Sequence, residues 1–530
     1  MASTTEQLAL LGTFLQPMSM DVEKCHVLSE RFLKNFVRLS AESLDQFLPT
    51  PISESILRPV ADYAHGRGGT NLRVGFVELL AGDSVAPPSN TSHGINGNRG
   101  NGANDSTTGQ VIPTSPAGRV RRHLGKSWPI SNHLKSDNGD SLFLWIGKCV
   151  AEVVEEGCRA FNLPISTPLP LGITFSFPAE QPSLEKAIIS SMGKGFAIPP
   201  HVDLGIHLQA AYDKHRGDKL PPIYVAAIAN DSVSTLISFI FNYDRPGHRR
   251  AAMGLILGTG SNATIPVKLR LLHPSKRPKN VNVLPGEKVE DVKIAVNTEW
   301  SINGTAPPMR ELGLISAWDD ELSAKNEKPG FQPLEYMTAG RYLGELGRIM
   351  FVDYMTSRLN VGRDLLPRKI LEQDVLTTTF LSHFKPLQPT TLLATLRAEF
   401  PEPAGSEFVW TEHHAEALYR IAKAIEVRAA GIIAAAIIAL LALGEEIPAD
   451  GSPPPPTWET GELGVGYTGG CIVHFQDYLV DCQHFVDQLV KRRCGNDFPP
   501  RVAMSPCHDG GITGAGILVA AALSSQASQT

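Results

Sequence analysis

The sequence predicts an α/β protein of two domains, and three observations support this fold class. The chain has 530 residues, too many for one ordinary hydrophobic core. Apolar, strand-like runs alternate with helix-compatible segments along its length. The clearest run begins at Tyr224, ends on Asn230 and Asp231, and is followed by a helix-compatible segment. Because α/β proteins bind ligands at the carboxyl ends of their strands, we take this stretch as the centre of the molecule.

Composition narrows the class of protein. Hydrophobic residues make up 42% of the chain and charged residues 19%, which is ordinary for a soluble globular protein. The formal net charge of -6 gives no electrostatic argument for binding nucleic acid or a membrane. No basic region followed by an apolar core opens the chain, so we expect no secretory signal. The seven cysteines lack metal-ligand spacing and indicate reduced thiols, so no metal site is expected on these grounds.

The pattern of apolar residues predicts the order of the elements. A segment rich in Gly, Ser, Asn, Thr and Pro, at about 81–116, cannot bury enough apolar surface and is expected to be a disordered surface insertion. The four consecutive prolines within 448–460 predict a loop. Helices are expected at 22–47, 146–161, around 184–192, 204–212, 334–357 and within 373–444, and strands at 72–80, 171–178, 224–230, from 253 and from 294.

One stretch, from Ala429 to Gly444, is almost wholly apolar. It has about 16 residues, short of the roughly 20 that span a bilayer, so we expect a buried core helix. We therefore predict an intracellular, cytoplasmic protein that does not enter a membrane. The short basic clusters 119–123 and 491–493 are interpreted as solvated surface, although as localisation signals they would allow a nuclear pool.

Asp231 admits two interpretations from its position. It could cap the helix that follows the strand, since Asp is a preferred N-cap residue. It could also be a catalytic carboxylate at the carboxyl end of a strand. Carboxylates recur in similar places at Glu299 and Glu335. Together with Ser and Asn side chains, they offer the acceptors and donors that a polyol ligand requires.

Glycine-rich turns also recur after strands, where backbone N–H groups can approach phosphate oxygens closely. None of them is a Walker A loop, and each one singly is more often an ordinary tight turn. Their repetition beside carboxylates points to phosphoryl transfer to a sugar. The turns are Gly66-Arg-Gly-Gly-Thr-Asn, Gly258-Thr-Gly-Ser-Asn, Gly466-Tyr-Thr-Gly-Gly and Asp509-Gly-Gly-Ile-Thr-Gly-Ala-Gly.

Several longer motifs resemble the hexokinase/glucokinase family, whose two actin-like ATPase (ribonuclease H-like) domains flank a sugar-binding cleft. The resemblance runs from about residue 20 to 520, outside the insertion. Leu171-Gly-Ile-Thr-Phe-Ser-Phe-Pro resembles the family's LGFTFSFP, Gly193-Lys-Gly-Phe its TKGF, and Asn230-Asp-Ser-Val-Ser-Thr-Leu its NDTVGTL. Asn297-Thr-Glu-Trp is identical to its NTEW, and Pro329-Gly-Phe-Gln-Pro-Leu-Glu-Tyr-Met is similar to its PGQQLYEKM.

This resemblance implies site residues and a chemical role for each. Asp231 would be the general base that accepts the proton of the sugar 6-hydroxyl, a role typically worth ~10²–10⁴-fold in rate. The hexose-binding residues would be Ser176, Lys194, Asn230, Asp231, Asn262, Glu299 and Glu335. The phosphate- and nucleotide-binding residues would be Gly68, Gly69, Thr70, Asn71, Gly258, Thr259, Gly260, Gly469 and Gly510.

The nucleotide side departs from the family pattern at three positions. The Asp of the family's first phosphate loop, D-x-G-G-T-N, is Gly66 here, and Asp62 lies too far along the chain to replace it. The Asp of the adenosine turn D-G-S is Thr468. Ile512 stands where the family has a glycine near the nucleotide, and it is expected either to strain that turn or to fill the space. ATP and Mg²⁺ are the cofactors implied if the protein is active, and these changes argue against their binding.

The sequence therefore predicts a hexokinase-like protein that binds glucose or a related hexose but has impaired ATP-dependent 6-phosphoryl transfer, with a sugar-sensing or regulatory role. One alternative is an active hexokinase with a rewired metal site, in which Arg67 supplies charge that the family obtains in another way. A second is an interaction scaffold that binds neither ligand. The insertion at 81–116 could contact regulatory proteins. The expected parts are an N-terminal helical segment (1–56), a small domain (57–225), a large domain (226–517) and a tail (518–530).

Overall fold

The computed structural model describes two compact units of the chain. Unit 1 contains residues 1–41, 255–262 and 299–505, and unit 2 contains residues 42–254, 263–298 and 506–530. Each unit is thus built from several separate stretches of chain, whereas each predicted domain is one continuous stretch. The exact limits of the predicted domains stay a prediction. The residues that the structure describes are 4–58, 71–79, 110–111, 120–131, 133–134, 139–190, 198–245, 247–386, 389–448, 461–495, 501–507 and 510–527.

Unit 2 is a mixture of strands and helices, which agrees with the predicted α/β class. Its elements are β1 (Leu48–Ser53), α3 (Glu54–Leu57), β3 (Asn71–Leu79), β4 (Gln110–Val111), β5 (Val120–Pro129), α5 (Gly139–Phe161), β6 (Leu169–Phe175), β7 (Ala179–Ser183), β8 (Lys186–Ile189), α6 (Leu204–Arg216), β9 (Ile223–Asn230), α7 (Asp231–Tyr243), β10 (Arg249–Leu257), β11 (Ser261–Lys268), η2 (Leu269–Leu271), η3 (Pro274–Lys276), β12 (Lys293–Asn297) and α18 (Gly510–Ala527). Residues 255–257 of β10 and 261–262 of β11 belong to unit 1.

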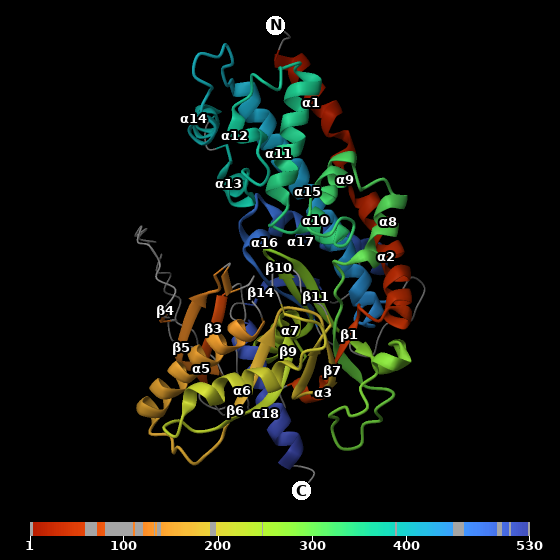
Figure 1. Ribbon diagram of the computed structural model, residues 1–530. Coiled ribbons are helices and arrows are strands. Elements are labelled where there is room, and N and C mark those ends of the chain that lie inside the picture. The colour runs from red at the N-terminus through yellow and green to blue at the C-terminus, as the bar shows by residue number, and fades with distance from the viewer. Residues whose placement is uncertain are drawn as a thin grey trace. The chain divides into compact units, whose positions relative to one another are not determined.

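Strand pairing in unit 2 places the ends of the predicted sugar-binding segments next to one another. β6 and β9 are parallel, and their register pairs Phe175 with Asn230. β12 lies between β1 and β11 and is antiparallel to both, so Asn297 is opposite Leu48 on one side and Thr264 on the other. β3, β5 and β4 form a separate antiparallel sheet. Helices α5 and α6 pack side by side (Figure 1).

Close packing of α18 against α7 needs small residues. An added Cβ at Gly514 would lie 2.0 Å from the carbonyl oxygen of Ser234, and one at Gly510 would lie 2.9 Å from Cα of Thr235. Thr174 on β6 completes the junction, because its hydroxyl donates to the Gly511 carbonyl at 2.9 Å and lies 3.0 Å from the Ser234 hydroxyl. α18 also packs against β9, so it supports the strand that ends at Asn230.

Unit 1 is mostly helical. Its elements are α1 (Thr4–Leu15), η1 (Gln16–Met18), α2 (Val22–Glu42), η4 (Asn303–Thr305), α8 (Ala306–Glu311), α9 (Ala317–Ala324), α10 (Pro333–Thr338), α11 (Leu343–Asp353), the π-helix η5 (Tyr354–Arg358), α12 (Arg368–Leu371), α13 (Thr378–His383), α14 (Pro389–Glu399), α15 (Glu412–Leu443), β13 (Glu462–Thr468), α16 (Gly470–His474), α17 (Tyr478–Cys494) and β14 (Arg501–Pro506). Its strands follow the order β10-β13-β14.

Helix α15 forms the core of unit 1 and packs against α10, α11, α14 and α17. It contains the apolar stretch that the sequence predicts as a buried helix, and it extends further towards the N-terminus. Among the described helices it is the one apolar and long enough to cross a membrane, but 89% of its most apolar window is buried in the protein, as in a soluble core. Buried Arg428 on this helix forms two bonds of 2.6 and 2.7 Å to the Asp319 carboxylate. This pairing satisfies both charges, as burial requires.

One predicted element was wrong. The segment 184–192 was expected to be helical, but β7 and β8 form an antiparallel hairpin there. In β8 the buried residues are Ala187 and Ile189, two positions apart, so burial follows the period of a strand. The predicted insertion 81–116 contains the short strand β4, which pairs with β5; its remaining residues, and 449–460 of the Pro-rich loop, lie outside the described residues.

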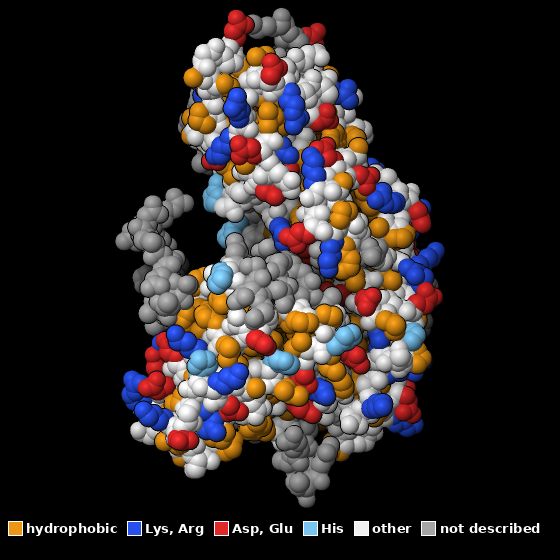
Figure 2. All heavy atoms as spheres, viewed as in Figure 1, with side chains coloured by type: hydrophobic (Ala, Val, Ile, Leu, Met, Phe, Trp, Pro, Cys, Tyr) orange, Lys and Arg blue, Asp and Glu red, His pale blue; other side chains and the backbone are white. Residues whose placement is uncertain are grey.

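The surface carries charges of both signs. Lys and Arg side chains are interspersed with Asp and Glu side chains over the face in view in Figure 2. Such a mixture is typical of a soluble surface.

Candidate functional site

The junction of β9 and α7 places three predicted site residues in unit 2. Asn230 is the N-cap of α7, because its Oδ1 accepts bonds from the backbone N–H and the hydroxyl of Ser232 at 2.9 and 2.8 Å. Asp231 is therefore the first residue of the helix rather than its cap. Its half-buried carboxylate lies at the helix end where the backbone dipole favours negative charge. Ser176 follows Phe175, which pairs with Asn230, so it lies beside this junction.

Asn230 keeps one polar atom for a ligand. Its Nδ2 is buried and has no hydrogen-bond partner among the described residues. A buried donor without a partner costs about 1–3 kcal/mol, so such groups are rare unless something binds to them. The amide is also fixed, since Ser232 holds Oδ1 and the Ser232 hydroxyl lies 2.6 Å from that of Thr264 on β11. The donor is therefore held in place before any ligand arrives.

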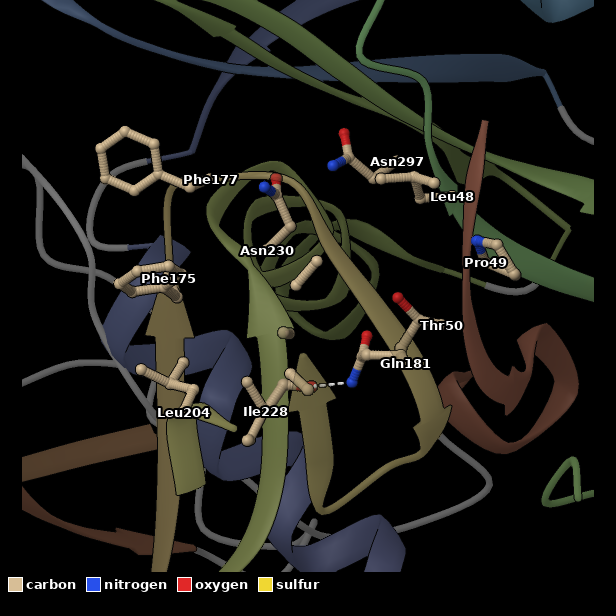
Figure 3. A pocket seen from close by; sticks show the side chains of 13 residues that line it. Leu48, Pro49, Thr50, Phe175, Phe177, Gln181, Leu204, Ile228, Asn230 and Asn297 are labelled. Atoms are coloured by element: carbon tan, nitrogen blue, oxygen red, sulfur yellow. Dashed lines mark hydrogen bonds between the residues drawn. The ribbon is translucent and has the colours of Figure 1, made fainter. Parts of the chain in front are cut away.

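A pocket in unit 2 opens beside Asn230 (Figure 3). Its empty volume is about 360 Å³ with open solvent included. The Gln181 amide, on its wall, donates to the Ile228 carbonyl at 2.7 Å. The lining combines amides and a hydroxyl with aromatic and aliphatic side chains: Leu48, Pro49, Thr50, Phe175, Phe177, Ala179, Gln181, Ala187, Leu204, Ile228, Ala229, Asn230 and Asn297.

In unit 1, two carboxylates lie beside the start of β11. Glu335 on α10 is 3% exposed, and its Oε2 accepts the backbone N–H of Ser261 at 3.0 Å. Its other oxygen, Oε1, is buried and has no hydrogen-bond partner among the described residues. Glu299 accepts a bond from Asn262 Nδ2 at 3.1 Å, and its backbone has a φ of 45°. A non-glycine residue in this left-handed region is uncommon and recurs at functional sites.

The glycine turns of unit 1 lie against each other. Gly258 and Gly469 approach so closely that a Cβ added to Gly258 would be 3.3 Å from Cα of Gly469. Thr259 is exposed, and Gly260 accepts the N–H of Gly258 through its carbonyl at 3.0 Å. Within the described residues no three His, Cys, Asp or Glu side chains come together as a metal site. That these turns bind phosphate stays a prediction.

The structure describes some of the remaining predicted residues and not others. Ile512 lies in α18 with its side chain 6% exposed, and it is not among the described residues with positive φ, so it fills space without straining the backbone. Gly510 begins α18 in unit 2. Asn71 is the first residue of β3, and Lys194, Gly66, Gly68, Gly69 and Thr70 lie outside the described residues.

Ser261 and Asn297 are site residues that the sequence reasoning did not single out. Ser261 contacts one predicted ligand, because its N–H donates to Glu335, and its hydroxyl accepts from the Trp300 indole at 3.1 Å. Asn297 accepts from the Ser232 hydroxyl at 3.3 Å and lines the pocket. Both stand inside motifs quoted from the sequence, but only the fold shows which of their atoms face neighbouring site residues.

The geometry of the turn around Gly469 predicts that alanine substitutions at two adjacent glycines differ sharply in their effect on stability. Gly469 has a φ of 130°, and an added Cβ would lie 2.3 Å from the Leu257 carbonyl oxygen, whereas at Gly470 the nearest neighbour is His474 at 3.9 Å. Gly469→Ala should therefore destabilise the protein by more than about 1 kcal/mol, and Gly470→Ala should change its stability by about 0.5 kcal/mol or less. Urea unfolding of both variants measures this, and equal effects would contradict the geometry of the turn.

Comparison with known proteins places these features in one family. The family model described as Hexokinase matches residues 252–521, and a second model with the same description matches residues 10–241. Hexokinase-2 of Homo sapiens is 31% identical over 274 residues, which cover 51% of this chain and 26% of that protein. The chain thus spans about a quarter of the length of such relatives. Hexokinase-7 of Oryza sativa subsp. japonica is 26% identical over 429 residues, 78% of this chain and 82% of that protein.

Solved structures show the same fold. A hexokinase from Schistosoma mansoni complexed with glucose superimposes with a TM-score of 0.69 and 20% identity, covering 98% of this chain and 100% of that chain. A second hexokinase crystal structure gives a TM-score of 0.68, also at 20% identity and with the same coverage. These likenesses confirm the predicted α/β fold of the two-domain, actin-like ATPase type.

Proposed function

Because the chain belongs to the hexokinase family, we propose that it binds glucose or a related hexose, with Asn230 and Glu335 among its ligands. The observation that carries this proposal is the pair of buried, unpartnered polar atoms, Asn230 Nδ2 and Glu335 Oε1. One is a donor and the other an acceptor. A sugar hydroxyl both donates and accepts, so each atom by itself suits a hexose hydroxyl.

We propose further that phosphoryl transfer to this hexose is impaired. Phosphoryl transfer depends almost entirely on positioning and on electrostatic stabilisation by the metal and its ligands. Two carboxylates of the family's nucleotide side are replaced, by Gly66 and Thr468. Loss of one such contact to the transition state costs roughly 3–4 kcal/mol. Asp231 cannot compensate, because a general base acts only when the phosphoryl donor is held in line with the hydroxyl.

The role that follows is that of a cytoplasmic hexose sensor or regulator, with the segment 81–116 as a place for protein partners. The second candidate is an active ATP-dependent hexokinase, favoured by the presence of Asp231, Asn262, Glu299 and Glu335 and of the glycine turn at 258–260. The two candidates share the sugar site and differ in what happens to ATP.

Titration calorimetry with glucose tests the sugar site. We expect heat of binding at millimolar glucose for the wild-type protein. Glu335→Gln should weaken binding roughly 10- to 100-fold, because hydrogen bonds to charged groups contribute about 1.5–3 kcal/mol. The matched control is Glu321→Gln, since Glu321 is about half exposed and pairs with Lys325, the residue just after its helix. Absence of heat and of any thermal shift in the wild-type protein would rule out the proposed hexose site.

A gain-of-function variant tests the impairment. Gly66→Asp with Thr468→Asp, and the same pair with Ile512→Gly, should raise the rate of sugar-phosphate formation by roughly 10²–10³. Both versions are needed because Ile512 is buried, so its replacement also removes packing. A coupled assay measures the rate, with Asp231→Asn added to each variant as the negative control. Wild-type turnover of order 10 s⁻¹ would instead support the active hexokinase.

A further inference from the structure

Three segments of unit 1 meet at Gly340, and one of them directly follows α10, the helix that carries Glu335. The segments are the turn 258–261, the connection between α10 and α11 at 339–342, and the start of α16. A Cβ added to Gly340 would lie 2.9 Å from the Gly258 carbonyl oxygen and 3.2 Å from Cβ of Cys471. Neither neighbour is the flexible end of a side chain. The absence of a side chain at Gly340 therefore sets how closely the three segments approach.

Hydrogen bonds attach the turn 258–261 to the α10 segment at both of its ends. At one end, the N–H groups of Gly340 and Arg341 donate to the carbonyls of Gly258 and Thr259, at 2.8 and 3.2 Å. At the other end, the Ser261 N–H donates to Glu335 Oε2. The turn is thus held by the backbone after α10 and by the carboxylate on α10.

Cys471 at the start of α16 and Tyr478, the first residue of α17, contact the C-terminal end of α10. The Thr338 carbonyl accepts a bond from the Tyr478 hydroxyl at 3.1 Å and lies 3.9 Å from Sγ of Cys471. Tyr478 is fully buried, and burial raises the pKa of its hydroxyl well above the usual value, so the hydroxyl keeps its proton and remains a donor. α10 therefore has a fixed end at Thr338 and a carboxylate at Glu335 that still has one oxygen to offer.

We propose that Gly340 is a positioning residue, which couples occupation of Glu335 Oε1 by a hexose hydroxyl to the ordering of the turn 258–261. This coupling rests on the proposed function, since it requires that a hexose binds Glu335. It goes beyond that function, because it links sugar binding to the order of a turn that is predicted to bind phosphate. A hydroxyl bound to Oε1 restricts rotation of the carboxylate and hence strengthens the Oε2 bond to Ser261. The order then extends to the Gly340 and Arg341 bonds, since both hold the same turn.

Amide hydrogen exchange on the full chain, with and without saturating glucose, tests this coupling. Glucose should slow exchange in fragments covering 339–342 roughly 5-fold or more, although no predicted hexose ligand lies in that stretch. In Gly340→Ala the added methyl group separates the turn from α10, so glucose should still bind but no longer slow exchange there. The matched control is Gly12→Ala on α1, where a Cβ meets nothing within 4 Å, and it should behave like the wild-type protein.

The outcomes separate the coupling from the proposed function. Glucose binding by calorimetry without any slowing at 339–342 in the wild-type protein would overturn the coupling and leave the hexose site standing. Slowing that persists in Gly340→Ala would overturn the role of Gly340. Absence of glucose binding would overturn both proposals. The wild-type measurement decides the coupling even if Gly340→Ala fails to fold.

Discussion

The hydrogen bonds that Ser232 makes to Asn230 Oδ1 fix the junction on which the sugar side of the molecule depends. They begin α7 at Asp231, so the predicted general base stands at the positive end of a helix. The same Ser232 hydroxyl reaches Thr264 and Asn297, and so connects α7 to β11 and β12. With Oδ1 engaged in this way, the amide of Asn230 is held rigidly and its Nδ2 remains available.

Glu335 repeats this arrangement in unit 1. One oxygen is anchored by the Ser261 N–H, and the other has no partner in the part of the chain that the structure describes. A binding residue must be both held in place and available, and a side chain with two polar atoms can satisfy the two demands separately. The anchored atom also gives such a residue a connection to its surroundings, which is why Glu335 can report its occupation to the turn at 258–261.

Some of these features could be predicted from the sequence and others could not, for physical reasons. The strand before Asn230 and the buried helix within α15 were predictable because long apolar runs admit few alternatives. The helix expected at 184–192 was wrong, since Leu184, Ala187 and Ile188 fit a helical spacing, while the hairpin that forms buries Ala187 and Ile189. The cap at Asn230 could not be distinguished from one at Asp231 without the backbone. Ser261 was missed because it acts through its N–H, and every residue except proline has one.

The central proposal is an asymmetry: the predicted hexose-binding residues are present in the sequence, whereas Gly66 and Thr468 stand where the family has carboxylates on the nucleotide side. Ile512 is larger than the glycine that the family has at this position. Its side chain is buried within α18, and its backbone shows no strain. The most direct measurement is a calorimetric titration of Mg²⁺–ATP into the protein saturated with glucose. The account predicts a Kd of about 1 mM or weaker, which corresponds to about -4 kcal/mol. A Kd near 1 μM, about -8 kcal/mol, would contradict it.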